Sequence, residues 1–168
     1  QHSICGNSYR LRSRELIAED LAAMRDRWGC RHVYFVDESL SPRLLRHISQ
    51  ASLETGTDLR WGCELRAERS LTREDLDLAY GAGCRVFSFG IESANQRVLD
   101  SMNKGIKVEE IQRLLRDCRE AGIRSHLMFI VGFPGETPEE LDDSLEFVRR
   151  NNALIDHVGF SYFVLLRH

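Results

Sequence analysis

The sequence predicts an α/β fold in which helices cover a parallel sheet, and three observations lead to that prediction. First, amphipathic helical segments alternate with short apolar segments along all 168 residues. Second, the apolar segments begin about 25 to 40 residues apart, which is the length of one βα unit. Third, capping residues mark the boundaries between segments. Because no low-complexity stretch or proline-rich linker interrupts the alternation, residues 1–168 are expected to form one domain.

Hydrophobic periodicity gives the extent of each element, since apolar residues either recur along one helix face or run continuously through a buried strand. Helices are expected over residues 14–28, 42–55, 73–82, 94–103, 108–121 and 138–151. Strands are expected over residues 32–37, 59–64, 85–91, 124–131 and 157–166.

Capping residues support these boundaries without reference to hydropathy. Ser41-Pro42 and Thr137-Pro138 each place a side-chain acceptor at the N-cap and a proline at the first helical position. Three pairs have the spacing of a capping box: Thr72 with Asp75, Ser93 with Gln96, and Thr137 with Glu140. Glycines follow the last apolar residue of five helices, as left-handed C-caps do, at Gly29, Gly56, Gly83, Gly105 and Gly122.

Composition narrows the classes of partner. The formal net charge of -3 gives no reason to expect nucleic acid or an anionic membrane as a partner, so a small-molecule substrate is expected. No apolar run is long enough to span a membrane, and no signal segment opens the chain. The five cysteines lie far apart without C-x-x-C spacing, which favours reduced thiols and a cytoplasmic location.

Polar residues gather where the predicted strands end, which is where parallel α/β proteins bind ligands. The segments are Asp37-Glu38-Ser39, Glu64-Leu65-Arg66, Glu92-Ser93, Gly132-Phe133-Pro134-Gly135-Glu136-Thr137 and Leu166-Arg167-His168. The first also suits a solvated turn, and Glu64 with Arg66 also suits a structural ion pair on one face of an extended segment.

Glu92 stands out because it ends an apolar strand and directly precedes a helix. A carboxylate there accepts hydrogen bonds from hydroxyl or ammonium groups of a ligand. Lys104 follows the short helix, where it either stabilises the helix C-terminus or reaches a ligand carboxylate. His126 lies inside a strand and is expected to be a core or barrel-lining residue rather than a catalytic one.

The glycine-rich segment at residues 132–137 follows a very apolar strand. Its two glycines and proline fix a turn whose backbone could lie flat against a planar ligand. Free N–H groups in such a turn would also suit a phosphate, but the acidic Glu136 would repel one.

These segments, in this order, resemble the radical S-adenosylmethionine (SAM) superfamily. The resemblance is nearest to the branch that often carries an N-terminal cobalamin-binding domain, to methylthiotransferases and to the oxygen-independent coproporphyrinogen oxidase. It runs from about Tyr9 to Leu166 and depends on four marks. They are Tyr34-Phe35-Val36-Asp37-Glu38-Ser39, Cys63-Glu64-Leu65-Arg66-Ala67-Glu68, Phe89-Gly90-Ile91-Glu92-Ser93 with Asn103-Lys104-Gly105, and Gly132-Phe133-Pro134-Gly135-Glu136-Thr137.

The resemblance implies a partial TIM-like (β/α)6 barrel that holds SAM across its strand ends. The backbone at Asp37 and Glu38 would meet the methionine amino group. Glu64 and Glu92 would make polar contacts to the nucleoside and the amino acid part, and Lys104 would pair with the methionine carboxylate. Ile130 and Gly132 would pack on the adenine, and the expected site also includes Arg66 and Ser93.

The sequence departs from the family pattern at both ends. Members of the family hold a [4Fe-4S] cluster with three cysteines spaced C-x-x-x-C-x-x-C, whereas Cys5 stands alone here. The cluster ligands and the first strand are therefore expected upstream of Gln1, with no metal ligand in this chain. Arg167-His168 stand where relatives have a Pro-Gly-Thr turn, so the final helix is expected to be missing as well.

The implied activity of the intact protein is reductive cleavage of SAM to a 5′-deoxyadenosyl radical. It would need the cluster and a one-electron reductant such as ferredoxin or flavodoxin, and the branch resemblance makes cobalamin possible. This chain alone is expected to be inactive. Two alternatives are a barrel enzyme that binds a phosphorylated substrate at residues 132–137, and a non-catalytic binding module that has lost the cluster.

Overall fold

The computed structural model describes residues 11–165, apart from the side chains of Glu38 and Ser39. Its elements are α1 (Arg14–Asp26), β1 (His32–Leu40), α2 (Pro42–Glu54), β2 (Arg60–Leu65), α3 (Arg73–Gly81), β3 (Cys84–Glu92), α4 (Gln96–Ser101), α5 (Val108–Ala121), β4 (Arg124–Val131), α6 (Pro138–Arg150), the 3-10 helix η1 (Asn152–Leu154) and β5 (His157–Tyr162). None of the described helices is both long and apolar enough to cross a membrane.

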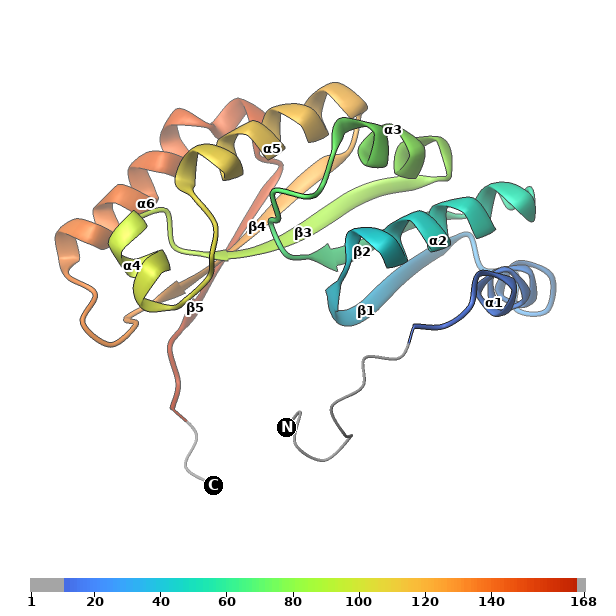
Figure 1. Ribbon diagram of the computed structural model, residues 1–168, viewed down its shortest axis with the longest axis horizontal. Coiled ribbons are helices and arrows are strands. Elements are labelled where there is room, and N and C mark those ends of the chain that lie inside the picture. The colour runs from blue at the N-terminus through green and yellow to red at the C-terminus, as the bar shows by residue number, and fades with distance from the viewer. Residues whose placement is uncertain (1–10, 166–168) are drawn as a thin grey trace.

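The five strands form one parallel sheet in the order β1-β2-β3-β4-β5. A parallel pair needs a crossover connection, and helices supply these connections along the chain. Figure 1 shows α2, α3, α5 and α6 along the same face of the curved sheet. The predicted α/β fold with a parallel sheet and covering helices is therefore confirmed.

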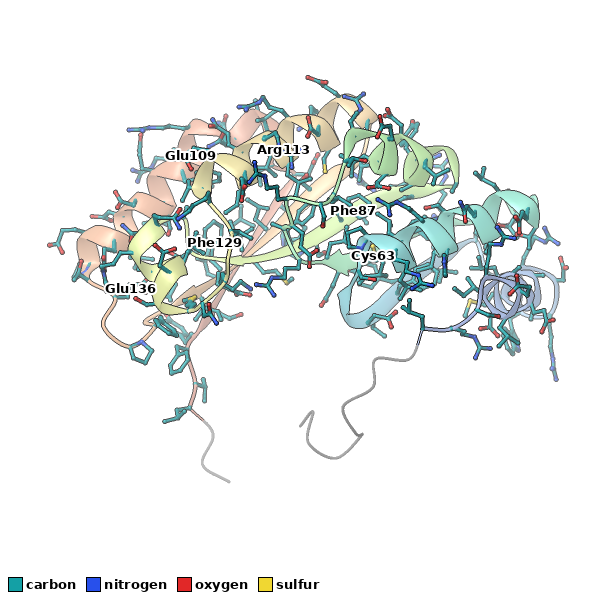
Figure 2. All side chains as sticks on the ribbon, in the orientation of Figure 1. Cys63, Phe87, Glu109, Arg113, Phe129 and Glu136 are labelled. Carbon is teal, nitrogen blue, oxygen red and sulfur yellow. The ribbon has the colours of Figure 1, made fainter. Side chains whose placement is uncertain are left out.

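The two faces of the sheet differ in chemistry because successive strand residues point to opposite sides. The outer face, under the helices, carries the large buried side chains Trp61, Cys63, Phe87, Phe89, Leu127 and Phe129. Figure 2 labels Phe87 and Phe129 among the side chains between the sheet and α5. The inner face, which we define by its strand residues, carries Tyr34, Gly62, Glu64, Ser88, Gly90, His126, Met128 and Gly159.

The buried thiols belong to the outer-face core. Cys63, Cys84 and Cys118 are fully buried, and Cys30 is half-buried. Burial raises the pKa of all three buried thiols, that of Cys118 to about 12. These three thiols therefore pack in the core and stay protonated at neutral pH.

Several helix ends follow the predicted caps. Ser41, Thr72 and Thr137 each accept a hydrogen bond from a backbone N–H in the first turn of the helix they precede. The Thr72–Asp75 and Thr137–Glu140 capping boxes are both present. The five predicted C-terminal glycines all have positive φ, in the range from +56° to +100°.

The predicted start of α4 is wrong by two residues, and the Ser93–Gln96 capping box does not form. The N-cap is Asn95, whose side chain accepts from the N–H of Val98. The hydroxyl of Ser93 instead accepts from the N–H of Asn95 and contacts the hydroxyl of Ser144 on α6 at 3.3 Å. The Ser93 side chain therefore makes a tertiary contact instead of the N-cap hydrogen bond that the local spacing predicts.

The predicted end of the last strand is also wrong, since β5 stops at Tyr162 rather than at residue 166. Its neighbour β4 ends at Val131, which pairs with Tyr162 and accepts one further hydrogen bond from the N–H of Phe163. Beyond that point β4 offers β5 no backbone partner. The helical segments predicted over residues 14–28 and 94–103 are shorter too, because α1 ends at Asp26 and α4 at Ser101.

Candidate functional site

Glu92 owes its orientation to an irregular strand end. Gly90 pairs with Met128 and Glu92 pairs with the next residue, Phe129, so one extra residue of β3 lies between the two pairs. Glu92 has a φ of 66°, in the left-handed region that non-glycine residues rarely adopt. Its carboxylate consequently lies over Gly90, where a Cβ atom would come within 2.8 Å of Oε1. The turn points the Glu92 carboxylate toward the inner face, where the absence of a side chain on Gly90 leaves space for it.

Lys104 is positioned by the C-terminus of α4. The N–H of Asn103 donates to the carbonyl of Asp100, and the N–H of Lys104 donates to the carbonyl of Leu99. Asn103 has a φ of 53°, and this left-handed residue together with the two hydrogen bonds forms a Schellman motif. This motif ends the helix and turns the following chain back toward β3.

The two charged groups meet as an ion pair. Nζ of Lys104 donates to Oε1 of Glu92 at 3.0 Å, and the two side chains are only 21% and 20% exposed. These residues, which are separated by a helix in the sequence, therefore converge in the structure. The pair presents one anion and one cation side by side at the carboxyl end of β3.

The end of β2 adds a second acid and a second base. The guanidinium of Arg66 donates to the backbone carbonyl of Lys104, which ties β2 to the turn after α4. Glu64 is half-buried on the inner face. The alternative of a Glu64–Arg66 ion pair is wrong, since no such contact lies within 4.0 Å among the described residues.

These side chains line a cavity of about 440 Å³. Its lining is Glu64, Leu65, Arg66, Gly90, Glu92, Met102, Asn103, Lys104 and Met128. This volume is within the range of small-molecule sites, about 300 to 1,000 Å³. Four of the residues proposed from the sequence therefore share one hollow at the carboxyl ends of β2 and β3.

Other residues proposed from the sequence lie outside the cavity lining. Ser93 is fully buried against α6, because its hydroxyl contacts Ser144. Asp37 is exposed on β1, Ile130 lies further along β4 than Met128, and Gly132 follows the end of β4. The side chain of Glu38 lies outside the described part of the chain.

Two lining residues were not found by sequence reasoning. Met102 and Met128 occupy apolar positions that look like ordinary core positions in the sequence. For Met128 the signal was available, since alternation along β4 places it on the same face as His126. For Met102, at the C-cap of α4, we find no such signal.

The loop at residues 132–137 is closed by its own carboxylate. The N–H of Gly132 donates to Oε2 of Glu136 at 2.7 Å, and the N–H of Glu136 donates to the carbonyl of Phe133 at 2.8 Å. Arg97 of α4 donates to the carbonyl of Gly135 at 2.6 Å. Figure 2 labels Glu136 beside α4. The N–H of Gly132 already donates to the Glu136 carboxylate, so it is not free to bind a phosphate. This hydrogen bond weighs against a phosphate site in the loop.

Arg97 also fixes the helix that follows the loop. Its guanidinium donates to the carboxylate of Glu140, the third residue of α6. This contact, together with the N–H of Thr137, lowers the pKa of Glu140 to about 2. The short helix α4 is therefore joined to the start of α6 by charge, and the Ser93–Ser144 contact joins the segment before α4 to the middle of α6.

Below the cavity, a row of polar side chains crosses the inner face. The hydroxyl of Tyr34 donates to Oγ of Ser88 at 2.8 Å, and that oxygen lies 3.2 Å from Nδ1 of His126. The ring of His126 contacts the ring of His157 with 4.5 Å between centroids. Burial and the neighbouring His157 lower the pKa of His126. The interpretation of His126 as a barrel-lining polar residue is confirmed.

The described residues contain no group of three or more His, Cys, Asp or Glu side chains arranged to hold a metal ion. The described thiols at Cys63, Cys84 and Cys118 are enclosed in the core. Cys5 lies outside the described residues.

Comparison with known proteins shows the family of this chain. The family model of the radical SAM superfamily matches residues 4–148. An uncharacterised methyltransferase of Pyrococcus horikoshii is 28% identical over 158 residues, which cover 93% of this chain and 34% of the relative. The ribosomal protein uS12 methylthiotransferase RimO of Heliobacterium modesticaldum is 32% identical over 169 residues, which cover 92% of this chain and 36% of the relative.

Among solved structures, the radical SAM methyltransferase TsrM of Kitasatospora setae superimposes with a TM-score of 0.79. It is 25% identical in sequence, and the match covers 96% of this chain and 33% of TsrM. That structure contains cobalamin and a [4Fe-4S] cluster. The chain spans about a third of the length of these relatives. The family match, together with the fold, shows that this chain belongs to the radical SAM superfamily.

Proposed function

We propose that the cavity beside Glu92 and Lys104 is the seat of the SAM methionine group. The observation on which the proposal depends is the 3.0 Å ion pair between these residues. An α-amino acid carries an ammonium and a carboxylate one carbon apart. Because Glu92 and Lys104 present the complementary pair of charges, each can exchange its protein partner for one end of the amino acid.

The chemistry of the remaining lining residues fits the rest of the SAM molecule. Glu64 offers acceptors for ribose hydroxyls and a negative charge near the sulfonium, and Met128 offers an apolar contact. Arg66 holds the Lys104 backbone and so fixes the turn from which the ammonium projects. Ile130 near the end of β4 and Gly132 directly after that strand would pack on the adenine, and the backbone at Asp37 and Glu38 would meet the amino group.

The proposed reaction of the complete protein is reductive cleavage of SAM. A reduced [4Fe-4S] cluster supplies the electron for that chemistry. Cys63, Cys84 and Cys118 are enclosed in the core, and no described residues are arranged to hold a metal ion, so cysteines outside the described residues would hold the cluster. This chain's own part is to bind and orient SAM, because it supplies the charged groups but no described cluster ligand.

The reaction class that we favour is methyl or methylthio transfer to a small-molecule or macromolecular substrate, because the relatives are methyltransferases and a methylthiotransferase. Cobalamin is a proposed second cofactor because TsrM was solved with cobalamin bound. A one-electron reductant such as ferredoxin or flavodoxin and a cytoplasmic location complete the proposal, since the cluster chemistry needs an electron and reduced thiols.

Calorimetric titration of SAM into the complete, anaerobically reconstituted protein tests the proposed site. We expect Lys104→Met to weaken SAM binding about 10-fold to 100-fold, as loss of one charge-assisted contact does. Lys107→Met is the matched control, because it removes an ammonium that is 59% exposed and contacts Asp100 rather than Glu92. Equal affinity in wild type and Lys104→Met would contradict the assignment. Binding without formation of 5′-deoxyadenosine under reductant would favour the non-catalytic module instead.

A further inference from the structure

A second hollow occupies the opposite end of the inner face. It has a volume of about 610 Å³ and is larger than the cavity at Glu92 and Lys104. Its lining is His32, Val33, Tyr34, Arg60, Trp61, Gly62, Arg85, Val86, Gly122 and Arg124. We call this hollow the basic pocket, because three arginines and a histidine line it and no acidic residue does.

The strand register explains why these cations gather. His32 and Arg60 are the first residues of β1 and β2 and pair with each other. Arg124 is the first residue of β4 and pairs with Val86. Arg85 is an extra residue of β3, since Trp61 pairs with Cys84 while Gly62 pairs with Val86. The amino ends of four adjacent strands therefore each contribute a basic side chain.

One of the arginines is held rigidly. The guanidinium of Arg85 donates to the carbonyls of Tyr80 and Cys84, at 2.8 and 2.6 Å, and lies 4.3 Å from the centroid of the Tyr80 ring. Its charge is fixed at the wall of the pocket, but its Nη1 is committed to the backbone. Arg85 therefore contributes electrostatic potential more than a free hydrogen-bonding fork.

The other two arginines are available to a ligand. Within residues 11–165, neither the Arg60 nor the Arg124 side chain forms a salt bridge or a hydrogen bond, and both residues are exposed. Most other described arginines pair with a carboxylate, as Arg46 does with Asp75 and Arg73 with Glu120. The chain as a whole has a net charge of -3, so composition does not account for uncompensated cations in one hollow.

The basic pocket is separate from the proposed SAM site. The two hollows share no lining residue. The side chain of Tyr34 crosses β2 above Gly62, where a Cβ atom would come within 3.2 Å of Tyr34 Cδ2, and its hydroxyl reaches Ser88 on β3. This tyrosine lines the upper limit of the basic pocket and separates it from Glu64 and the proposed SAM site.

We propose that the basic pocket binds a small polyanion that carries phosphate or carboxylate groups. Arg60 and Arg124 would bind it through their guanidinium forks, and Arg85 would add a fixed charge. Arginine suits this ligand because its planar donors match two oxygens of one phosphate or carboxylate. The pocket is a concave hollow within the volume range of small-molecule sites, which favours a small anion over an extended acidic protein surface. The proposal does not depend on SAM binding at the other end of the sheet.

Calorimetric titration of the complete protein with sodium pyrophosphate and, separately, with citrate tests this proposal. We expect saturable binding of at least one of the two anions, with an affinity that falls when the salt concentration rises. The comparison of the two probes distinguishes a phosphate ligand from a carboxylate ligand. In the double variant Arg60→Gln/Arg124→Gln, binding should weaken about tenfold or more, while the affinity for SAM should stay unchanged.

The matched control is the double variant Arg43→Gln/Arg116→Gln, which removes the same charge from exposed positions on α2 and α5 outside the basic pocket. It should bind the anion as the wild type does. Absence of saturable binding to either probe would overturn the proposal. It would also be overturned by unchanged binding in Arg60→Gln/Arg124→Gln, or by equal weakening in both double variants.

Discussion

The carboxylate of Glu92 lies directly above Gly90, so that a Cβ atom on Gly90 would come within 2.8 Å of Glu92 Oε1. Real Cβ atoms do not come that close to another heavy atom, so any side chain at position 90 must displace the carboxylate. Gly90 itself does not have positive φ, and its backbone therefore accepts alanine. The glycine is needed for space at the site rather than for its own conformation.

The first prediction concerns this contact. Gly90→Ala should weaken SAM binding about tenfold, because Glu92 can no longer hold its place opposite Lys104. The melting temperature should change little, since the displaced group is a partly exposed carboxylate rather than part of the core. Calorimetry with SAM and thermal denaturation measure the two effects. Gly81→Ala is the control, because a Cβ atom there meets nothing within 4 Å.

The second prediction concerns Asn103, which has a φ of 53° and ends α4. Asn103→Val should lower the free energy of unfolding by about 1 to 2 kcal/mol, because a β-branched residue resists the left-handed conformation. It should also weaken SAM binding by moving Lys104. Asn103→Gly should preserve both properties, since glycine adopts positive φ without strain. Urea unfolding and SAM titration of the two variants check this; equal behaviour of valine and glycine would contradict it.

The sequence predicts the strands and helices well where local chemistry decides them. Thr72 and Thr137 cap their helices because the N–H groups they bind lie within the first turn. The predicted cap at Ser93 is wrong because the contact partner of its hydroxyl, Ser144, is 51 residues away in the sequence. No local sequence pattern predicts a contact between residues so far apart in the chain.

The site was predictable only in part, for a related reason. Strand ends at Glu64 and Glu92 indicate where a ligand binds, because parallel strands end at one edge of the sheet. The meeting of Glu92 with Lys104 depends on a bulge in β3 and two residues with positive φ, Glu92 and Asn103. Neither residue is a glycine, so the sequence gives no sign of the left-handed backbone. The resemblance to a family, rather than residue spacing, indicated that both residues line one site, and their ion pair is seen only in the structure.

The third prediction concerns the loop at residues 132–137. In Glu136→Ala the amide of Gly132 loses its acceptor at 2.7 Å and the loop loses its internal closure. Hydrogen exchange at residues 132–137 should therefore accelerate about tenfold or more, as measured by mass spectrometry. SAM binding should weaken several-fold if Gly132 packs on the adenine. Asp142→Ala, an exposed acid on α6, is the control and should leave exchange in the loop unchanged.

The fourth prediction concerns Asp75, whose side chain is only 5% exposed. Burial alone would raise the pKa of Asp75, but the guanidinium of Arg46 and the hydroxyl and N–H of Thr72 outweigh burial and lower it. A carboxyl whose pKa is lower in the folded state contributes stability above the unfolded-state pKa of about 4. That contribution is lost as the pH falls through the folded-state pKa.

Asp75→Asn should therefore lower the free energy of unfolding at pH 7 by about 1 to 3 kcal/mol, because it leaves Arg46 without its carboxylate and weakens the cap of α3. The difference between wild type and variant should shrink as the pH falls from about 5 toward 2, since protonation removes the same interaction from the wild type. Urea unfolding across this range measures the difference. Asp77→Asn, which removes an exposed acid from the same helix, should show a much smaller effect because its partner Arg73 also contacts Glu120. A pH-independent difference for Asp75→Asn would show that packing, and not the charge of Asp75, stabilises this part of the fold.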